Sequence, residues 1–447
     1  MGDGVKFQTL EYKAHKNQVA LCKAIYHGID TAKDLIYPSP NEYKKDYETR
    51  QELATLNNFV ERTVTTMAGQ IFRVPISFKD MPTSLEAKTK TINGKRDLNA
   101  LAKNLCKSGI LSGKAYALAD LPINGGNVYV SIIERDQLIN YEKDANENFT
   151  FAVIHEFVTK KVSRFESELI EQYRVYDATG NIELWRKGTD TKNGSAGEFE
   201  LKEKIVTSYS FIPLYELNID DVPPLYDIAK INANHLNASS RKDSYLDVAG
   251  SPIPFAKGLG VDAEEQLNGE GDAPAPVMVL GVKSIIFTDN PEASMEWVEM
   301  TGQNIEALQD DLERKERSMA ERALKVITQS VKTATQVEQE ASESNSRLSD
   351  IAQDIEIVLT SLLNGISMML FNSAFDGQVI ANRDFKTVAY DGQTITALNA
   401  LVLAGNLSRE TLLTSLVKGE VIEVDSVEDE VKKIEDENLG IKNDDRV

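Results

Sequence analysis

Residues 336–374 read QVEQEASESNSRLSDIAQDIEIVLTSLLNGISMMLFNSA, and this stretch does most to decide the fold. Apolar side chains recur in it at steps of four and three residues, which places them on one face of an α-helix. They are Val337, Ala341, Leu348, Ile351, Ile355, Val358, Leu362, Ile366 and Met369. A helix of these 39 residues would be about 58 Å long. Because it spans far more than one small domain, we expect it to pack along its length against its own chain or neighbouring copies.

Two further helices are predicted before this one. Leu225 to Val248 follows the pair Pro223-Pro224, and proline suits the first turn of a helix. Glu296 to about Lys325 has apolar residues at heptad-like steps and acid–base neighbours four residues apart. The packing candidates on the first of these helices are Leu225, Ile228, Ala229, Asn232 and Leu236. Its small residues, which would permit close approach of a neighbour, include Asn234, Ala238 and Ser239.

The other segments mix helix and strand. Short apolar runs between residues 127 and 209 are separated by Asn- and Gly-containing turns, which predicts an antiparallel sheet of about 80 residues. Residues 251–295 are rich in Gly and Pro and suit a compact β insert. Helices are further expected at 42–66, 98–111, 394–404 and 409–418, a polar loop at 88–94, and a strand at 384–390. We therefore predict an α+β fold.

The charge balance limits the function. The chain has 447 residues, with 49 Lys and Arg against 70 Asp and Glu, so its net charge is −21. Residues 420–447 alone hold 4 basic and 11 acidic residues, which gives −7. Such a chain is a poor general binder of nucleic acid, because duplex DNA is held mainly by Lys and Arg on its phosphates. We expect the chain to contact DNA, if at all, without holding it tightly.

The number of cysteines and the hydropathy pattern indicate the cellular environment of the chain. Cys22 and Cys106 are too few for a disulfide framework, so we expect a reducing compartment or indifference to redox. Residues 357–375 carry no charge, but Thr, Ser, Asn and Gly interrupt them and acidic residues flank them. This pattern favours a helix buried in protein over a membrane span, and no membrane is expected.

Catalytic and cofactor motifs are absent from the sequence. Gly109 to Ala115 is one residue too short for a phosphate-binding loop, and Ala115 stands where Ser or Thr should bind Mg²⁺. The four histidines are far apart in sequence and give no zinc pattern. No cofactor, metal or catalytic residue is predicted, and we expect no enzymatic activity. A hydrolase site without a recognisable motif is left as an alternative.

Three patches follow one another along the chain in a characteristic order. The first comprises Tyr37-Pro38, Tyr43, Tyr47, Arg50, Asn57, Arg62, Thr63, Gly69 and Ile71-Phe72-Arg73-x-Pro75. The second comprises Pro223 to Ala229, Asn232, His235 and Ser251-Pro252-Ile253-Pro254. The third comprises Ala404 to Thr411, followed by the acidic tail. In this order and spacing the chain resembles the portal proteins of tailed bacteriophages.

The resemblance implies an architecture. Two stem helices would flank a small β clip, a channel loop would precede a long wing helix, and a helical crown would end the chain. The segments would be 1–223 for the N-terminal wing, 224–249 for stem helix 1, 250–295 for the clip, 296–325 for stem helix 2, 326–335 for the channel loop, 336–391 for the long wing helix and closing strand, and 392–447 for the crown and acidic tail.

The resemblance also implies a function and partners. Portals form a ring, most often of twelve copies, at one vertex of the capsid, and the genome is packaged and ejected through it. The terminase large subunit docks on the clip, and a head–tail adaptor replaces it later. The major capsid protein holds the wing and stem, and a scaffold protein assists assembly. The chain would work in the virion, after assembly in the host cytoplasm.

Double-stranded DNA would pass through an acidic channel without sequence specificity, because like charge keeps the duplex from sticking. Lys325 and Lys332, beside the expected channel loop, are the candidates for transient phosphate contact. They could equally be two solvated lysines. Another capsid-associated assembly or head–tail joining protein is a further alternative.

Overall fold

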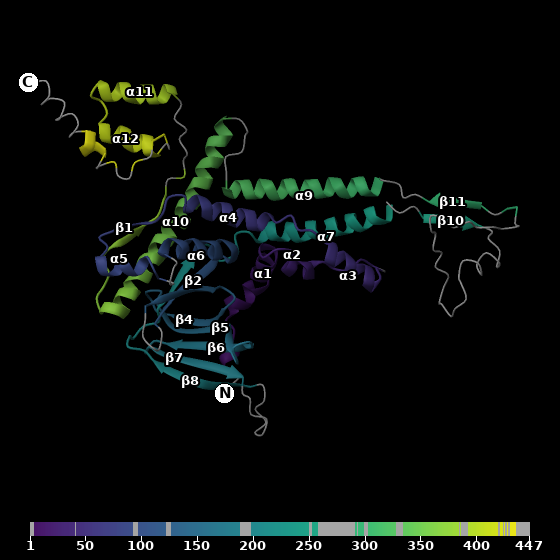
Figure 1. Cartoon of the computed structure of the whole chain (residues 1–447), viewed down its shortest axis with the longest axis horizontal. Coiled ribbons are helices and arrows are strands. Elements are labelled where there is room, and N and C mark those ends of the chain that lie inside the picture. Colours follow the sequence, from purple (N-terminus) through teal and green to yellow (C-terminus); the bar gives the residue numbers. More distant parts are fainter. Residues whose placement is uncertain are drawn as a thin grey trace, which may run out of the picture.

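Helices and strands are mixed along the chain, which confirms the expected α+β class (Figure 1). The computed structural model describes residues 4–40, 42–92, 97–121, 127–187, 198–249, 253–257, 291–292, 294–298, 303–327, 334–383, 385, 392–418, 421–422, 424, 427 and 430–434. Most of the expected clip, of the channel loop and of the acidic tail therefore lies outside the described residues.

Short helices form the N-terminal part. The single helix expected over 42–66 is wrong, because the backbone turns extended at Ala54 and a new helix begins after Asn58, whose side chain accepts a hydrogen bond from Glu61 N. The polar loop expected at 88–94 is partly wrong, since a helix reaches Thr89. These helices are α1 (Leu10–Tyr26), α2 (Ile29–Ala32), α3 (Lys44–Leu53), α4 (Phe59–Ile71), α5 (Thr83–Thr89) and α6 (Leu98–Ser112).

Two antiparallel sheets follow, where a single sheet was expected. In the first sheet the strand order is β3-β2-β9, and in the second it is β4-β5-β6-β7-β8. The strands are β2 (Lys114–Asp120), β3 (Tyr129–Glu134), β4 (Leu138–Lys143), β5 (Phe149–Lys161), β6 (Ser167–Asp177), β7 (Asn181–Lys187), β8 (Phe199–Val206) and β9 (Leu214–Asn218). The sequence pattern missed β2 because it is buried on both faces and does not alternate.

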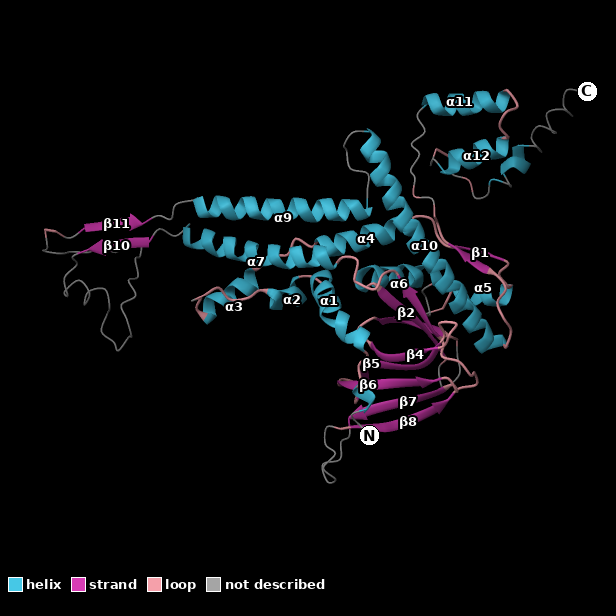
Figure 2. Ribbon diagram, turned by 180° about the vertical axis from the view of Figure 1, so that it is seen from behind, coloured by secondary structure: helices cyan, strands magenta, loops and turns pink. Residues whose placement is uncertain are grey.

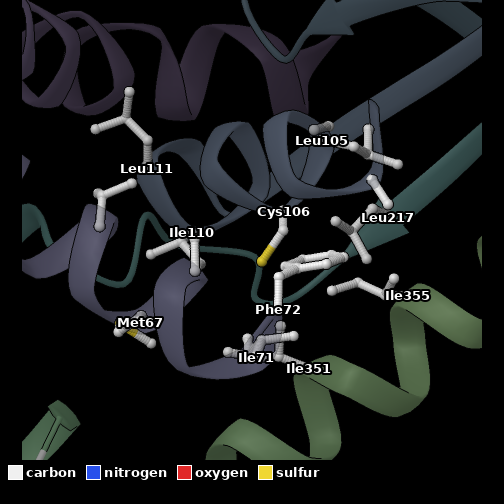
Figure 3. Packing of buried hydrophobic residues seen from close by; sticks show 14 of the residues in the cluster. Met67, Ile71, Phe72, Leu105, Cys106, Ile110, Leu111, Leu217, Ile351 and Ile355 are labelled. Atoms are coloured by element: carbon white, nitrogen blue, oxygen red, sulfur yellow. The ribbon is translucent and has the colours of Figure 1, made fainter. Parts of the chain in front are cut away.

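The long helix is α10 (Ala334–Phe371), 38 residues against the 39 expected. From Leu348 to Ile366 its apolar face is buried against α4, α6, β2 and β9 of the same chain. Figure 3 shows Ile351 and Ile355 of α10 facing Ile71 and Phe72 at the end of α4. By length and composition Arg347–Phe371 could also cross a membrane, and half of its most apolar window is buried inside the protein.

A helix pair projects from this body and ends in two strands (Figures 1 and 2). Its members are α7 (Tyr226–Ala249), β10 (Ile253–Lys257), β11 (Ser294–Val298) and α9 (Gln303–Ile327). The helix expected from Glu296 is wrong at its start, because residues 294–298 pair with β10 in an antiparallel register that brings Trp297 opposite Pro254. Trp and Val favour strands, and this preference prevails over the heptad-like spacing.

The chain ends in two short helices and one further strand pair. α11 (Gly392–Leu403) and α12 (Arg409–Lys418) confirm the two helices expected there. β12 (Gln378–Ile380) pairs with β1 (Ser77–Lys79) and so returns the chain to the N-terminal part. Of the strand expected at 384–390, all but Phe385 lies outside the described residues.

Candidate functional site: the helix pair and its polar seam

The helix pair α7–α9 is built on a shared apolar face. All five packing candidates, Leu225 just before α7 and four residues in it, are buried inside the chain; the four apolar ones form part of the main core, and Asn232 is a buried polar residue. α9 contributes Leu312, Met319 and Ala323 to the buried side. The predicted packing residues therefore contact elements of their own chain, and the surface left for a neighbour comprises the exposed Asn234 and the half-buried Ala238 and Ser239.

Buried polar groups of α7, with their partners, form a row that is here called the polar seam. The seam joins α7 to the chain just before α4, through Asn232, and to the chain before α3, through Asn237. Asn232 is fully buried; its Oδ1 accepts from Phe59 N at 3.0 Å, and its Nδ2 donates to Asn57 O at 2.9 Å. Asn237 repeats the arrangement, since it accepts from Tyr37 N at 3.1 Å and donates to Leu35 O at 3.0 Å. Paired backbone groups of this kind fix the position of α7 along that segment.

Arg50 extends the seam toward the outer half of α7. Its guanidinium is buried and donates twice to the Glu42 carboxylate, with Nε–Oε1 and Nη2–Oε2 distances of 2.7 Å. The same group donates to Ser240 Oγ at 2.9 Å and to Tyr37 O at 2.9 Å. The hydrogen bond from Arg50 lowers the pKa of Glu42, so the carboxylate stays ionised.

His235 and Glu316 connect the two helices of the pair. His235 is 5% exposed, and its Nε2 lies 3.0 Å from Glu316 Oε1, which also accepts from Asn57 Nδ2 at 3.1 Å. Burial lowers the pKa of His235, which favours the neutral ring with Nε2–H as the donor. Its Nδ1 is buried and has no hydrogen-bond partner among the described residues. This contact couples α7, α9 and the start of α4.

The side chains of the two expected DNA-contact residues lie outside the part of the chain that the structure describes. Lys325 lies in the last turns of α9, but its side chain is outside the described residues, as is all of Lys332. Earlier in α9 the exposed side chains carry both signs of charge. They are Glu306, Asp310, Glu313, Arg314, Arg317, Glu321 and Arg322.

Residues 224–368 match a domain of unknown function (DUF4055). This range begins just before α7 and ends within α10, so it contains the helix pair and both strands between its helices. No curated protein matches the chain.

Three solved structures are similar to the chain at low identity. A structure titled as the virion of a native gene transfer agent particle has 14% identity and a TM-score of 0.43, and the alignment covers 89% of this chain and 98% of that one. The neck of the empty particle, computed with C6 symmetry, has 15% identity and a TM-score of 0.42, with 86% and 95% covered. The neck of the native particle, computed with C12 symmetry, has 15% identity and a TM-score of 0.37, with 80% and 89% covered.

Four of the eight residues named here for the polar seam were not singled out from the sequence. Arg50, Asn57 and His235 were quoted as residues of the resemblance, without a role, and Asn232 was also expected as a packing residue. Glu42, Asn237, Ser240 and Glu316 were missed. Arg50 and Ser240 are 190 positions apart, and no spacing rule joins residues at such a distance.

The described residues offer little reactive chemistry. They contain no group of three or more His, Cys, Asp and Glu side chains that could hold a metal ion. Cys22 and Cys106 are free and buried, and burial raises the pKa of each thiol to about 12. At neutral pH both are therefore protonated and unreactive. The arrangement of the seam suits a rigid connection between helices.

Proposed function

We propose that the chain is the subunit of a portal: a ring of twelve identical copies at one capsid vertex, through which double-stranded DNA is packaged and ejected. One observation carries this proposal. Two long helices are paired, joined at their far end by the strands β10 and β11, and followed by a 38-residue helix that crosses the body (Figure 1). This is the order stem, clip, stem and wing that the resemblance implies.

In this proposal the helix pair is the stem, and its rigidity has a purpose. A ring that transmits force between a packaging motor and a shell needs stem helices that keep one geometry. The polar seam supplies this, because a shift of α7 would leave several buried polar groups unpaired. The exposed Asn234 and its neighbours Ala238 and Ser239 would face the stem of the next copy.

The same proposal also specifies the partners. The terminase large subunit and later the head–tail adaptor would dock around β10 and β11, and ATP hydrolysis would belong to the terminase. The major capsid protein would hold the body and stem, with a scaffold protein assisting assembly. The net charge of −21 would repel phosphates, so that Lys325 and Lys332 make only transient contacts with the duplex.

Negative-stain electron microscopy of the purified protein tests the ring. We expect a ring with a central hole, alone or after addition of the scaffold and capsid proteins. A protein that stays monomeric by light scattering under all these conditions contradicts the proposal. A ring that is incorporated into particles but does not serve as the channel for DNA would favour the head–tail joining alternative.

A double variant, Lys325→Ala with Lys332→Ala, tests the channel. We expect it to form normal rings but to package less DNA, because the transient phosphate contacts are lost. The matched control is Lys13→Ala with Lys16→Ala, which removes two exposed cations from α1 and should leave packaging unchanged. If both double variants package equally well, the assignment of the two lysines is wrong.

A further inference from the structure

The strands β5 and β6 extend beyond the rest of their sheet. β4 pairs with β5 only as far as Ile154, and β7 pairs with β6 only from Gln172. His155 N still donates to Gln137 O, so residues 156–171, here called the arm, form a two-stranded ribbon for which no backbone pairing at the outer edges is found among the described residues. Figure 2 shows this sheet on the opposite side of the body from α9. A ribbon with free edges and no covering layer is marginal alone and invites a partner.

The surface of the arm is apolar, and its cations gather toward its tip. Phe165 at its tip is 92% exposed, and Phe157, Val162 and Leu169 are also mostly exposed. Residues 157–165 read FVTKKVSRF and contain three cations, Lys160, Lys161 and Arg164, and no acidic residue. Glu166 and Glu168 follow on the returning strand, and Glu168 lies opposite Lys160, so residues 160–168 have a net charge of 3 − 2 = +1 in a chain of net charge −21. An exposed aromatic ring with a cation beside it, as Arg164 lies over Phe165, is suited to anchor in a pocket on a partner.

A groove of opposite character lies between α3 and the outer half of α7. Its volume is about 660 Å³. Its charged lining residues are Glu42, Asp46, Asp243 and Asp247 against Arg50 and Arg241, so its charge is 2 − 4 = −2. Leu53 and Tyr245 give it an exposed apolar wall. No residue of the arm of the same chain lines it.

We propose that the arm tip of one copy, Lys160 to Phe165, docks into the α3–α7 groove of the next copy. The inference rests on the proposed function, because it places the contact between identical copies of the chain. Phe165 enters the groove beside Leu53 and Tyr245, and the cations of the arm face its carboxylates. Arm and groove are different surfaces, so the contact is head-to-tail, which is the type that closes into a ring.

Disulfide trapping tests the contact directly. Ser163→Cys places a thiol on the exposed tip, and Ser244→Cys places one in the groove wall. Both native cysteines are buried, so they do not interfere. After mild oxidation of a mixture of the two single variants, we expect a disulfide-linked dimer at about ten times the yield of a control mixture, the ratio that corresponds to about 1.4 kcal/mol of preference. The control replaces Ser244→Cys by Ser373→Cys, on an exposed site after α10.

Exchanging the charges of the arm and the groove tests whether electrostatic attraction holds the contact. Lys160→Glu with Lys161→Glu puts like charges against the groove, and we expect ring formation to need about tenfold more protein. Adding Asp243→Lys and Asp247→Lys in the same chain should restore assembly. All four positions lie at or near the surface, and the far-ultraviolet circular dichroism of each variant checks that the fold is kept.

The outcomes separate the inference from the proposed function. Rings that form without the specific disulfide, or without rescue by charge exchange, overturn the arm–groove contact and leave the portal proposal standing. A wild-type protein that never forms rings overturns the portal proposal. A specific disulfide in smaller assemblies would support the contact even then. Trapping of the arm on the capsid protein in place of a second copy would also overturn the inference.

Discussion

At position 232 a single buried amide holds α7 against the start of α4. Asn232→Leu keeps the side-chain size but removes both hydrogen bonds, the one that Asn232 Oδ1 accepts from Phe59 N and the one that Asn232 Nδ2 donates to Asn57 O. These two backbone groups keep a weak bond to each other at 3.1 Å, so only part of their pairing is lost. We expect the free energy of unfolding to fall by about 1–3 kcal/mol, measured by urea denaturation.

The matched control for this change lies on the same helix. Asn234 is exposed, so Asn234→Leu should change the free energy of unfolding by no more than about 0.5 kcal/mol. Equal losses in the two variants would show that helix propensity, which is the same for both, determines the effect and that the seam does not.

Protonation of His235 predicts a pH dependence of stability. Burial lowers its pKa from the usual value of 6.5, although the carboxylate of Glu316 opposes this shift. The unfolded chain therefore takes up the proton at a higher pH than the folded chain does. The contribution of the neutral ring is complete above the unfolded pKa, and it is lost as the pH falls from there toward the folded pKa.

Urea denaturation at about pH 7.5 and about pH 5 measures this effect of His235. We expect wild-type protein to lose more stability than His235→Gln over this interval, by at most about 1.4 kcal/mol per pH unit for one proton. His27→Gln removes an exposed histidine and should behave as the wild type. A wild-type profile that coincides with that of His235→Gln would contradict the assignment.

At the scale of elements, α10 lies unusually close to β9. A Cβ atom added at Gly365 would lie 1.7 Å from Tyr215 Oη and 2.7 Å from Tyr215 Cζ. Alanine normally stabilises a helix interior relative to glycine, but here it must displace the tyrosine. We expect Gly365→Ala to lower the free energy of unfolding by about 1–3 kcal/mol.

A second glycine provides the control for this prediction. Gly69, in α4, has nothing within 4 Å of an added Cβ. Gly69→Ala should therefore raise the free energy of unfolding, by up to about 1 kcal/mol. Combining Gly365→Ala with Tyr215→Phe removes the clashing oxygen and should recover part of the loss. Two alanine variants that change stability in the same direction would refute the close contact.

Elements with a long regular pattern were predictable from the sequence. The positions of α7 and α10 agree with the periodicity of their apolar residues, because a buried face determines them, and α12 lies where a helix was expected although none of its described residues is buried. The break between α3 and α4 and the strand β11 were not predictable, because a cap at Asn58 and pairing with β10 decide them. The polar seam was least predictable, since several of its hydrogen bonds join residues of α7 to segments more than 150 positions earlier.

At the scale of the whole molecule, α11 is an apolar helix without a core. Its sequence is GQTITALNALVL, yet no residue of it is buried, and Leu403 is 83% exposed. It packs on α12, whose described residues are likewise exposed or only half-buried. In a ring, copies of this helix would stand side by side around the axis and could cover one another's apolar faces.

Hydrogen exchange of the protein before and after assembly tests this arrangement of α11. In the single subunit we expect the amides of Gly392–Leu403 to exchange rapidly, because no buried contact opposes opening of the helix. In the ring their exchange should slow by at least about tenfold, since burial against neighbours adds to the free energy of opening. The amides of α6 are the internal control, because that helix is already buried in its own chain and should not change. Equal exchange of Gly392–Leu403 in both states would mean that neighbouring copies leave α11 uncovered and that ring formation depends on the stem and arm surfaces instead.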